Sequence, residues 1–344
     1  MTVCMEPEVQ KQAEPTLTTY YELAPQILVT PNAQQRVVIV VDASCELDPE
    51  FLKEAGVLVV PRVVGTRQQT YTLDANQTLH HTCAAHIPHS IAYQSSTISD
   101  IAHLYEQTLS NGMSIVSLHL PESLDNTVCS ARMAAKVVLA GTKHLTTTAP
   151  RIAICELAAV GLRFSFLVQA AAYAAREGLS LPQLVTFIEC LQKEIHSYYV
   201  TGIHGPIKTM RHSWRPKGVS RWGREQLWEY DIPAKKLICS ARGQIIQTLF
   251  KENGVLDETL TPTVCVHHPK LFNRMNAVRT KLSLPQIDPQ PSGISVSRCF
   301  PRGCVELHIF PEATHLTHML RVIHHIDQTA DLTIRGVRVR GGIA

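Results

Sequence analysis

Residues 37–65 constrain the fold more than any other stretch of the chain. Five consecutive aliphatic residues, Val37 to Val41, run directly into Asp42 without any alternation of polar and apolar positions. A short, unbroken apolar run rich in β-branched residues is typical of a strand buried on both faces, as in a parallel sheet. Asp42 and Ser44 are then expected at the carboxyl edge of the sheet, where open α/β sheets bind their ligands.

A helix and a second strand are predicted directly after this edge. Asp48 is the expected N-cap of the helix and Pro49 its first residue. The second strand is predicted over residues 57–64, with Pro61 as an interruption. Together these segments predict a β-α-β unit at the start of a parallel sheet.

Composition limits the class of protein. The chain has 344 residues, 45% of them hydrophobic and 18% charged, which favours two ordinary globular domains over one. Its net charge of +3 is too small to indicate binding of nucleic acid or of an anionic membrane. The ten cysteines form no CxxC pair, no apolar signal segment precedes them, and no apolar run reaches the length of a membrane span. We therefore expect a protein of the reducing cytoplasm, without cofactor and without an integral membrane segment.

Four segments are expected along the chain. Residues 1–35 are polar and are predicted to form a flexible N-terminal extension, and residues 36–197 a domain in which strands alternate with helices. Residues 198–312 are predicted to form a smaller mixed domain, and residues 313–344 a C-terminal appendage. The predicted fold class is therefore α/β, with a parallel-sheet N-terminal domain and a second, smaller mixed α/β domain.

Periodicity and turn residues place the remaining elements. In the first domain we predict a loop with short helices at 66–97, helices at 100–111 (capped by Ser99), 127–140, 162–177 and 181–196, and strands at 113–120 and 151–157. In the second domain we predict strands at 237–250, 263–267, 293–297 and 304–310, and a helix at 270–282.

Three segments carry a resemblance to a known family. Residues 42–47 (Asp-Ala-Ser-Cys-Glu-Leu), followed by Val-Val-Pro at 59–61, resemble the opening signature of the DegV family. Residues 121–127 resemble its Ser-Ser-x-Leu-Ser-Gly-Thr segment, and residues 94–96 part of its Thr-Ser-Gln-Pro-Ser segment. The resemblance implies a bacterial cytoplasmic protein that holds one long-chain fatty acid between two α/β domains, without catalysis of its own. For some members it also implies a fatty-acid kinase as partner.

The resemblance implies a ligand site made of hydroxyl groups and helix-start N–H groups, which form a neutral cradle for a carboxylate. For any single hydroxyl, capping a helix is the commoner role, and the position of several hydroxyls on successive strand ends is what favours a site. The expected ligand-binding residues are Ser44, Gln94, Ser95, Ser96, Asp125, Asn126, Thr127 and Arg298. Arg298 belongs to this set because a guanidinium group binds a carboxylate in bidentate fashion.

Asp125 and Asn126 depart from the family pattern, which has a carboxylate-binding serine and a glycine there. An ionised Asp125 beside a ligand carboxylate would repel it by about 1 to 4 kcal/mol at contact distance. Three interpretations follow: Asp125 faces away as a helix cap, it is protonated, or the head group of the ligand is not anionic. We favour the first, because aspartate is a frequent residue at helix starts.

Two alternatives to a lipid carrier arise from the same chain. Asp42 and Asp125, at adjacent strand ends, suit an enzyme that uses paired carboxylates for acid–base chemistry or to bind Mg²⁺. The other alternative is a degenerate family member that acts through protein contacts alone. A metal site is not expected, because the clustered histidines lack a cysteine or carboxylate at ligand spacing.

Overall fold

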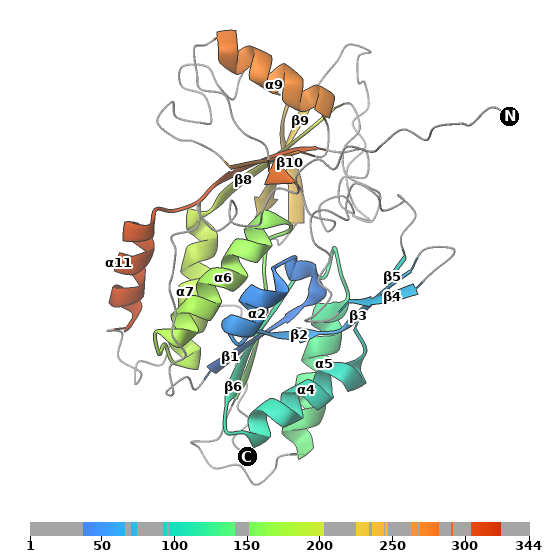
Figure 1. The fold of residues 1–344 in the computed structure, drawn as a ribbon, viewed down its shortest axis with the longest axis vertical. Helices are drawn as coiled ribbons and strands as arrows, with labels where there is room; N and C mark the ends of the chain where they lie inside the picture. The colour runs from blue at the N-terminus through green and yellow to red at the C-terminus, as the bar shows by residue number, and fades with distance from the viewer. Residues whose placement is uncertain are drawn as a thin grey trace, which may run out of the picture.

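The structure is a computed structural model. It describes residues 37–65, 70–73, 92–94, 96–141, 151–202, 225–233, 236–243, 245–246, 263–266, 269–281, 290–291 and 304–324. The predicted N-terminal extension and the predicted strand at 293–297 lie outside these residues. In the described part of the chain, the strands form a four-stranded, a six-stranded and a three-stranded sheet (Figure 1).

The first sheet has four parallel strands in the order β2-β1-β6-β7. These are β1 (Val37–Asp42), β2 (Leu58–Val60), β6 (Ser114–His119) and β7 (Ile152–Glu156). Every residue of β1 is buried, with Ile39 and Val41 in the core on one face and Val38 and Val40 in the core on the other. Burial on both faces explains why β1 shows no alternation, and the predicted parallel sheet is confirmed.

Helices cover both faces of this sheet (Figure 1). The core on one face contains residues of α4 (Ile98–Ser110) and α5 (Thr127–Gly141). The core on the other face contains residues of α2 (Pro49–Glu54), α6 (Leu162–Arg176) and α7 (Leu181–Glu194). Asp48 caps α2 as predicted, because its Oδ1 accepts a hydrogen bond from the N–H of Glu50 at 2.6 Å.

Two predicted helix ends are wrong by two residues. The cap of α4 is Thr97 rather than Ser99, because the hydroxyl of Thr97 accepts a hydrogen bond from the N–H of Asp100 at 3.1 Å. α7 ends at Glu194 instead of reaching His196, because His196 is the first residue of strand β8. Helical periodicity alone does not mark either boundary.

Pro61 divides the predicted strand at 57–64 between two sheets. β2 ends at Val60 in the first sheet, whereas β3 (Arg62–Gly65) pairs with β4 (Thr70–Leu73) and β5 (Ala92–Gln94) in a separate antiparallel sheet. Proline has no N–H to donate to a ladder, which is consistent with the end of β2 at this point. The described residues within 66–97 are therefore mainly strands, and not the predicted short helices.

The second sheet has the order β10-β9-β8-β13-β11-β12. Its strands are β8 (His196–Thr201), β9 (Glu225–Asp231), β10 (Lys236–Gly243), β11 (Thr263–Val266), β12 (Gln290–Pro291) and β13 (Val305–Ile309). Its pairs are antiparallel except β11 with β12, so it is a mixed sheet. α9 (Pro269–Lys281) packs on one face through Leu271 and Met275. The predicted fold class is confirmed, although β10 ends at Gly243 and not at residue 250.

The other face of the second sheet meets the carboxyl ends of the first. Tyr199 on β8 and Trp228 on β9 form a buried cluster with Ala158 and Val160, which follow β7. Leu124, in the loop after β6, packs against the same cluster. We call this set the interface cluster, because it joins residues of the two sheets.

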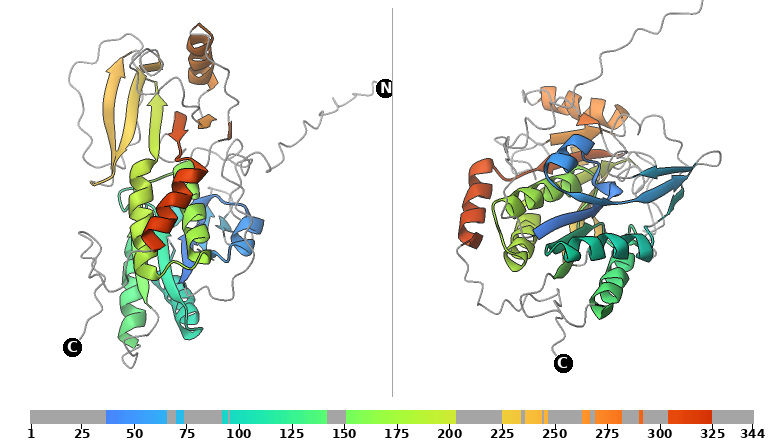
Figure 2. Two further views of the ribbon diagram at one scale, coloured as in Figure 1. Left: turned by 90° about the vertical axis from the view of Figure 1, so that its left-hand side faces the viewer. Right: turned by 60° about the horizontal axis from the view of Figure 1, so that its bottom comes forward.

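α11 (Ala313–His324) returns from the second sheet to α7, and Figure 2 shows it beside α6 and α7. Its Leu316, Leu320 and Ile323 belong to the core that α6 and α7 build on the first sheet. The side-chain amide of Gln183 in α7 donates a hydrogen bond to the carbonyl of Ile323 at 3.2 Å. The division of the chain into four segments stays a prediction.

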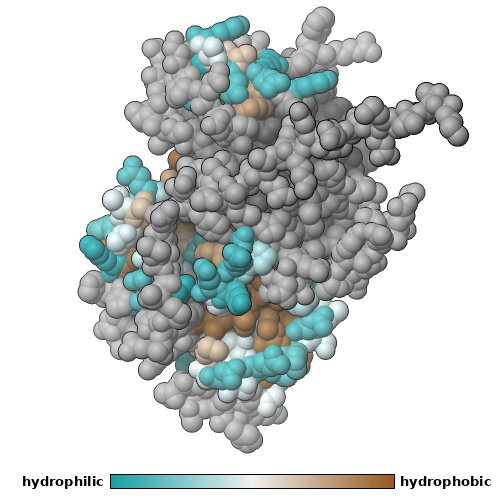
Figure 3. Space-filling model, in the orientation of Figure 1, coloured by the Kyte–Doolittle hydropathy of each residue, from teal (hydrophilic) through white to brown (hydrophobic). Residues whose placement is uncertain are grey.

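The last two features of the fold are an apolar surface patch and the length of the helices. In Figure 3, hydrophobic side chains gather between the hydrophilic side chains of α2 and those of α4, near the edge strand β2. Among the described helices, none is long and apolar enough to cross a membrane.

Candidate functional site

The site lies where the first sheet ends and begins with Asp42, the last residue of β1. Its Oδ1 accepts a hydrogen bond from the N–H of Ser44 at 2.8 Å, which caps the short helix η1 (Ala43–Cys45). Its Oδ2 lies 3.4 Å from Nδ1 of His119, the last residue of the neighbouring strand β6. Both side chains are fully buried. Parallel strands thus bring two polar groups together at one sheet edge.

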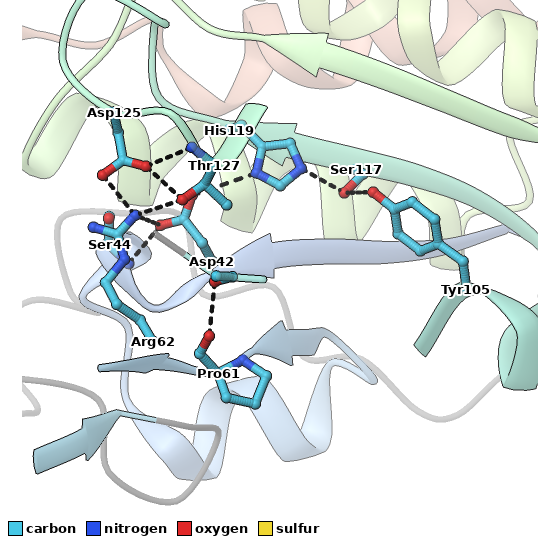
Figure 4. A network of polar contacts seen from close by, with 10 residues as sticks. Asp42, Ser44, Pro61, Arg62, Tyr105, Ser117, His119, Asp125 and Thr127 are labelled. Atoms are coloured by element: carbon cyan, nitrogen blue, oxygen red, sulfur yellow. Dashed lines mark hydrogen bonds and ion pairs between the residues drawn. The ribbon is translucent and has the colours of Figure 1, made fainter. Parts of the chain in front are cut away.

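Arg62 connects this edge with the loop after β6. Its Nη2 lies 2.8 Å from Oδ2 of Asp125 and 3.6 Å from Oδ1 of Asp42, and it donates a hydrogen bond to Oγ1 of Thr127 at 3.0 Å. Arg62 is only 3% exposed. A buried charge of this kind is tolerated only when it is paired and hydrogen-bonded, and here two carboxylates provide the pairing (Figure 4).

Asp125 also caps helix α5. Its Oδ1 accepts hydrogen bonds from the backbone N–H of Thr127, at 2.8 Å, and from the Thr127 hydroxyl. The loop that carries Asp125 turns back because the carbonyl of Pro121 accepts from the N–H groups of Leu124 and Asp125. Asp125 therefore combines a helix cap with an ion pair to Arg62.

A chain of buried hydrogen bonds extends from Asp42 across the sheet to α4. The Tyr105 hydroxyl donates to Oγ of Ser117 at 2.8 Å, and this Oγ lies 2.8 Å from Nε2 of His119. Because Ser117 accepts from Tyr105, its own proton is available to Nε2, and His119 then donates from Nδ1 to Asp42. Figure 4 shows these side chains in sequence from Tyr105 to Asp42. The chain fixes the position of Asp42.

The electrostatic environment keeps Asp42 ionised. Burial alone raises the pKa of this carboxyl, but the charge of Arg62 and the hydrogen bond to His119 lower it more strongly, so that the pKa lies well below its usual range. Burial raises the pKa of the Tyr105 hydroxyl well above its usual range. Within the described residues of this network, two carboxylates face one guanidinium group.

The structure brings together part of the predicted site. Ser44, Asp125 and Thr127 belong to the network around Arg62, and the Ser96 hydroxyl donates to the carbonyl of Pro61 at 2.7 Å, one residue before Arg62.

Of the other four predicted residues, two are placed by backbone contacts and two lie outside the described part of the chain. Asn126 is exposed, and its carbonyl accepts from the N–H groups of Cys129 and Ser130 in the first turn of α5. Gln94 is the last residue of β5, where its backbone is in register with Val63. Ser95 and Arg298 lie outside the described residues. A ligand-binding role for each of the eight residues stays a prediction.

Four residues of the network were not predicted: Arg62, Tyr105, Ser117 and His119. Ser117 and His119 interrupt the apolar strand Ser114–His119 on one face, which is a signal that the sequence does contain. Arg62 gives no such signal, because its partner Asp125 is 63 positions away and the two meet only in the folded chain.

The fold and the site define a class of protein: a two-sheet α/β protein in which polar strand ends of a parallel sheet adjoin an apolar contact with a second sheet. Residues 36–202 match the family model described as "Uncharacterised protein, DegV family". The resemblance found in the sequence is thereby confirmed over residues 36–202, which are just under half of the chain.

One relative among known proteins also matches part of this chain. A DegV domain-containing protein of Deinococcus radiodurans is 31% identical over 157 residues, which cover 44% of this chain and 52% of that protein. The match thus spans about half the length of this relative.

Three solved structures show the fold. A fatty-acid-binding DegV family protein of Thermus thermophilus matches with a TM-score of 0.56 at 15% identity, covering 80% of this chain and 100% of that chain. A stearic-acid-binding protein of Eubacterium ventriosum matches with 0.55 at 14%, covering 79% and 97%. A fatty-acid-binding DegV family protein of Streptococcus agalactiae matches with 0.58 at 13%, covering 81% and 99%. At these identities the likeness establishes the fold alone.

Proposed function

We propose that this protein binds one long-chain lipid, a fatty acid or a related lipid, between its two sheets, and has no catalytic activity of its own. One observation carries the proposal: the polar network adjoins the apolar interface cluster. Asp125 belongs to the network, and the preceding residue, Leu124, packs against the cluster. A single-chain lipid needs an apolar surface for its chain and a few placed polar groups for its head, and such sites occur preferentially at domain interfaces.

The comparisons support this proposal. The structures from Thermus thermophilus, Eubacterium ventriosum and Streptococcus agalactiae are named for fatty-acid or stearic-acid binding and share this fold over about four fifths of the chain. We extend the lipid ligand from those proteins to this one. The eight predicted ligand-binding residues, a cytoplasmic location and a fatty-acid kinase as partner are parts of the same proposal, and nucleic acid is not among the proposed ligands.

The enzyme alternative is less favoured. Asp42 and Asp125 do contact one common group. This group is the guanidinium of Arg62, which stands between the two carboxylates. Acid–base catalysis needs a carboxylate that can exchange a proton near neutral pH, whereas the pKa of Asp42 is held well below its usual range. Mg²⁺ binding would require the carboxylates to exchange Arg62 for the cation.

Lipid extraction tests the proposal. We expect the full-length protein, purified without detergent and extracted into organic solvent, to yield about one acyl chain per protein by mass spectrometry. Ala158→Trp should abolish this yield, because Ala158 is buried in the interface cluster and a large side chain there would take the volume that the proposal assigns to the acyl chain. Ala140→Trp, on the exposed end of α5, is the matched control and should keep the lipid.

Two results would contradict the proposal. One is a wild-type protein that carries no lipid and takes up none when long-chain lipids are added. The other is Ala158→Trp retaining its lipid while circular dichroism shows the native fold, which would place the ligand elsewhere.

A further inference from the structure

The strongest group for recognising a ligand carboxylate at this site already has a partner. Nη2 of Arg62 lies 2.8 Å from the Asp125 carboxylate and 3.0 Å from the hydroxyl of Thr127. Guanidinium–carboxylate contacts are among the strongest polar contacts in proteins. The carboxylate of Asp125 therefore holds the position on Nη2 that the carboxylate of a ligand would otherwise take.

The balance of charge also disfavours an anionic head group. Asp42 and Asp125 both contact the guanidinium group of Arg62, so a ligand carboxylate brought to this group would add a third negative group beside it. All three side chains are at most 4% exposed. Because burial lowers the local dielectric, repulsion between like charges is stronger here than at the protein surface.

The facing side of the second sheet carries a further carboxylate. Glu306 on β13 is in register with Tyr199, a member of the interface cluster, which places both side chains on the face that meets the first sheet. Oε2 of Glu306 lies 3.1 Å from Nε2 of His308, and the other ring nitrogen, Nδ1, lies 2.9 Å from Oγ of Ser197. The two sides of the interface thus both present acidic groups that are bound within the protein.

We propose that the lipid carried by this protein has an uncharged, hydrogen-bonding head group, as a long-chain alcohol has, and that Asp125 is the residue that selects against a carboxylate. This inference rests on the function proposed above. The Thr127 hydroxyl already accepts from Arg62 and donates to Asp125, whereas Ser44, whose backbone N–H donates to Asp42, carries a further hydroxyl beside the network. A hydroxyl suits such a head group, because it both donates and accepts hydrogen bonds. Asp125 determines specificity by occupying Nη2 of Arg62 and by placing a negative charge beside the head group.

A pair of ligands with the same chain tests the inference. The delipidated full-length protein is titrated at pH 8 with hexadecanol or with hexadecanoate, delivered from cyclodextrin, and displacement of a pyrene-labelled long-chain alcohol is measured. We expect the Kd for hexadecanol to be at least tenfold lower than the Kd for hexadecanoate. A wild-type protein that binds hexadecanoate as tightly as hexadecanol, or more tightly, overturns the inference.

Asp125→Asn tests the assigned residue. Asparagine can still cap α5 through its side-chain oxygen, but it no longer neutralises Arg62. We expect the affinity for hexadecanoate to rise at least tenfold in Asp125→Asn and to stay unchanged in Asp100→Asn, an exposed aspartate in the first turn of α4. An unchanged affinity in a folded Asp125→Asn protein contradicts the role of Asp125. If that variant does not fold, the wild-type comparison still decides the preference.

The same titrations separate this inference from the proposed function. Binding of neither ligand to the wild-type protein contradicts lipid binding itself, and the inference falls with it. Binding of hexadecanoate in preference to hexadecanol leaves lipid binding intact and contradicts only the uncharged head group.

Discussion

At the scale of single residues, Arg62 holds the site together. It lies on β3, outside the parallel sheet, and yet its guanidinium group contacts the end of β1 through Asp42 and the start of α5 through Asp125. A buried cation between two buried carboxylates is costly to expose and costly to leave unpaired. These contacts therefore fix the positions of β1, β3 and the loop before α5 relative to one another.

Removing Arg62 should be strongly destabilising. Arg62→Met leaves two buried carboxylates without a cation, and we expect the free energy of unfolding to fall by about 3 to 5 kcal/mol in urea titrations. Arg132→Met is the matched control. Arg132 pairs with Glu122 and Glu156 but is 41% exposed, so its loss should cost at most about 1 kcal/mol. Equal losses in the two variants would show that burial of Arg62 does not determine its contribution.

The pH dependence of stability should contain a contribution from Asp42. Its pKa is lowered on folding, so the stabilisation is fully present above the unfolded pKa, near 3.8, and is lost as the pH falls through the folded pKa. We expect the wild-type protein to lose unfolding free energy more steeply than Asp42→Asn between about pH 5 and about pH 3, as measured by urea unfolding. Parallel curves for the two proteins would mean that Asp42 titrates alike in the folded and unfolded states.

At the scale of elements, the start of α4 offers a direct comparison of two candidate caps. The structure assigns the cap to Thr97, whose hydroxyl accepts from the N–H of Asp100, whereas the sequence predicts Ser99. We expect Thr97→Ala to lower the free energy of unfolding by about 1 kcal/mol and Ser99→Ala to leave it nearly unchanged. Chemical denaturation of both variants measures the difference, and a larger loss in Ser99→Ala would reverse the assignment.

The elements show where sequence-based prediction succeeds and where it stops. β1 and α2 were predicted closely, because unbroken burial and the Asp48 cap are local signals. The interruption at Pro61 was predicted, but its consequence was not: the strand that follows joins another sheet through partners further along the chain, in β4 and β5. The ion pair of Arg62 with Asp125 escaped prediction for the same reason, since it depends on tertiary placement and on no local pattern.

At the scale of the whole molecule, two contacts among the described residues join the second sheet to the first. One is the interface cluster, and the other runs from β13 through Phe310, which stacks on Phe166 of α6 at 4.4 Å, into α11 on α7. A lipid between the sheets would touch the first contact, whereas α11 lies against α7 on the outside of the first sheet (Figure 2). α11 can therefore hold the two sheets together independently of a ligand.

This arrangement predicts that α11 couples the unfolding of the two sheets. Leu320 is buried in the core that α7 shares with α11, so Leu320→Ala should cost about 2 to 5 kcal/mol of unfolding free energy. Val322→Ala, on the same helix but 50% exposed, should cost less than about 0.5 kcal/mol. Hydrogen exchange should then show β8 and β13 opening more readily than β1 in Leu320→Ala, because the second sheet loses an attachment while the first keeps its two-sided core. Equal changes in protection across both sheets would mean that the interface cluster alone couples them.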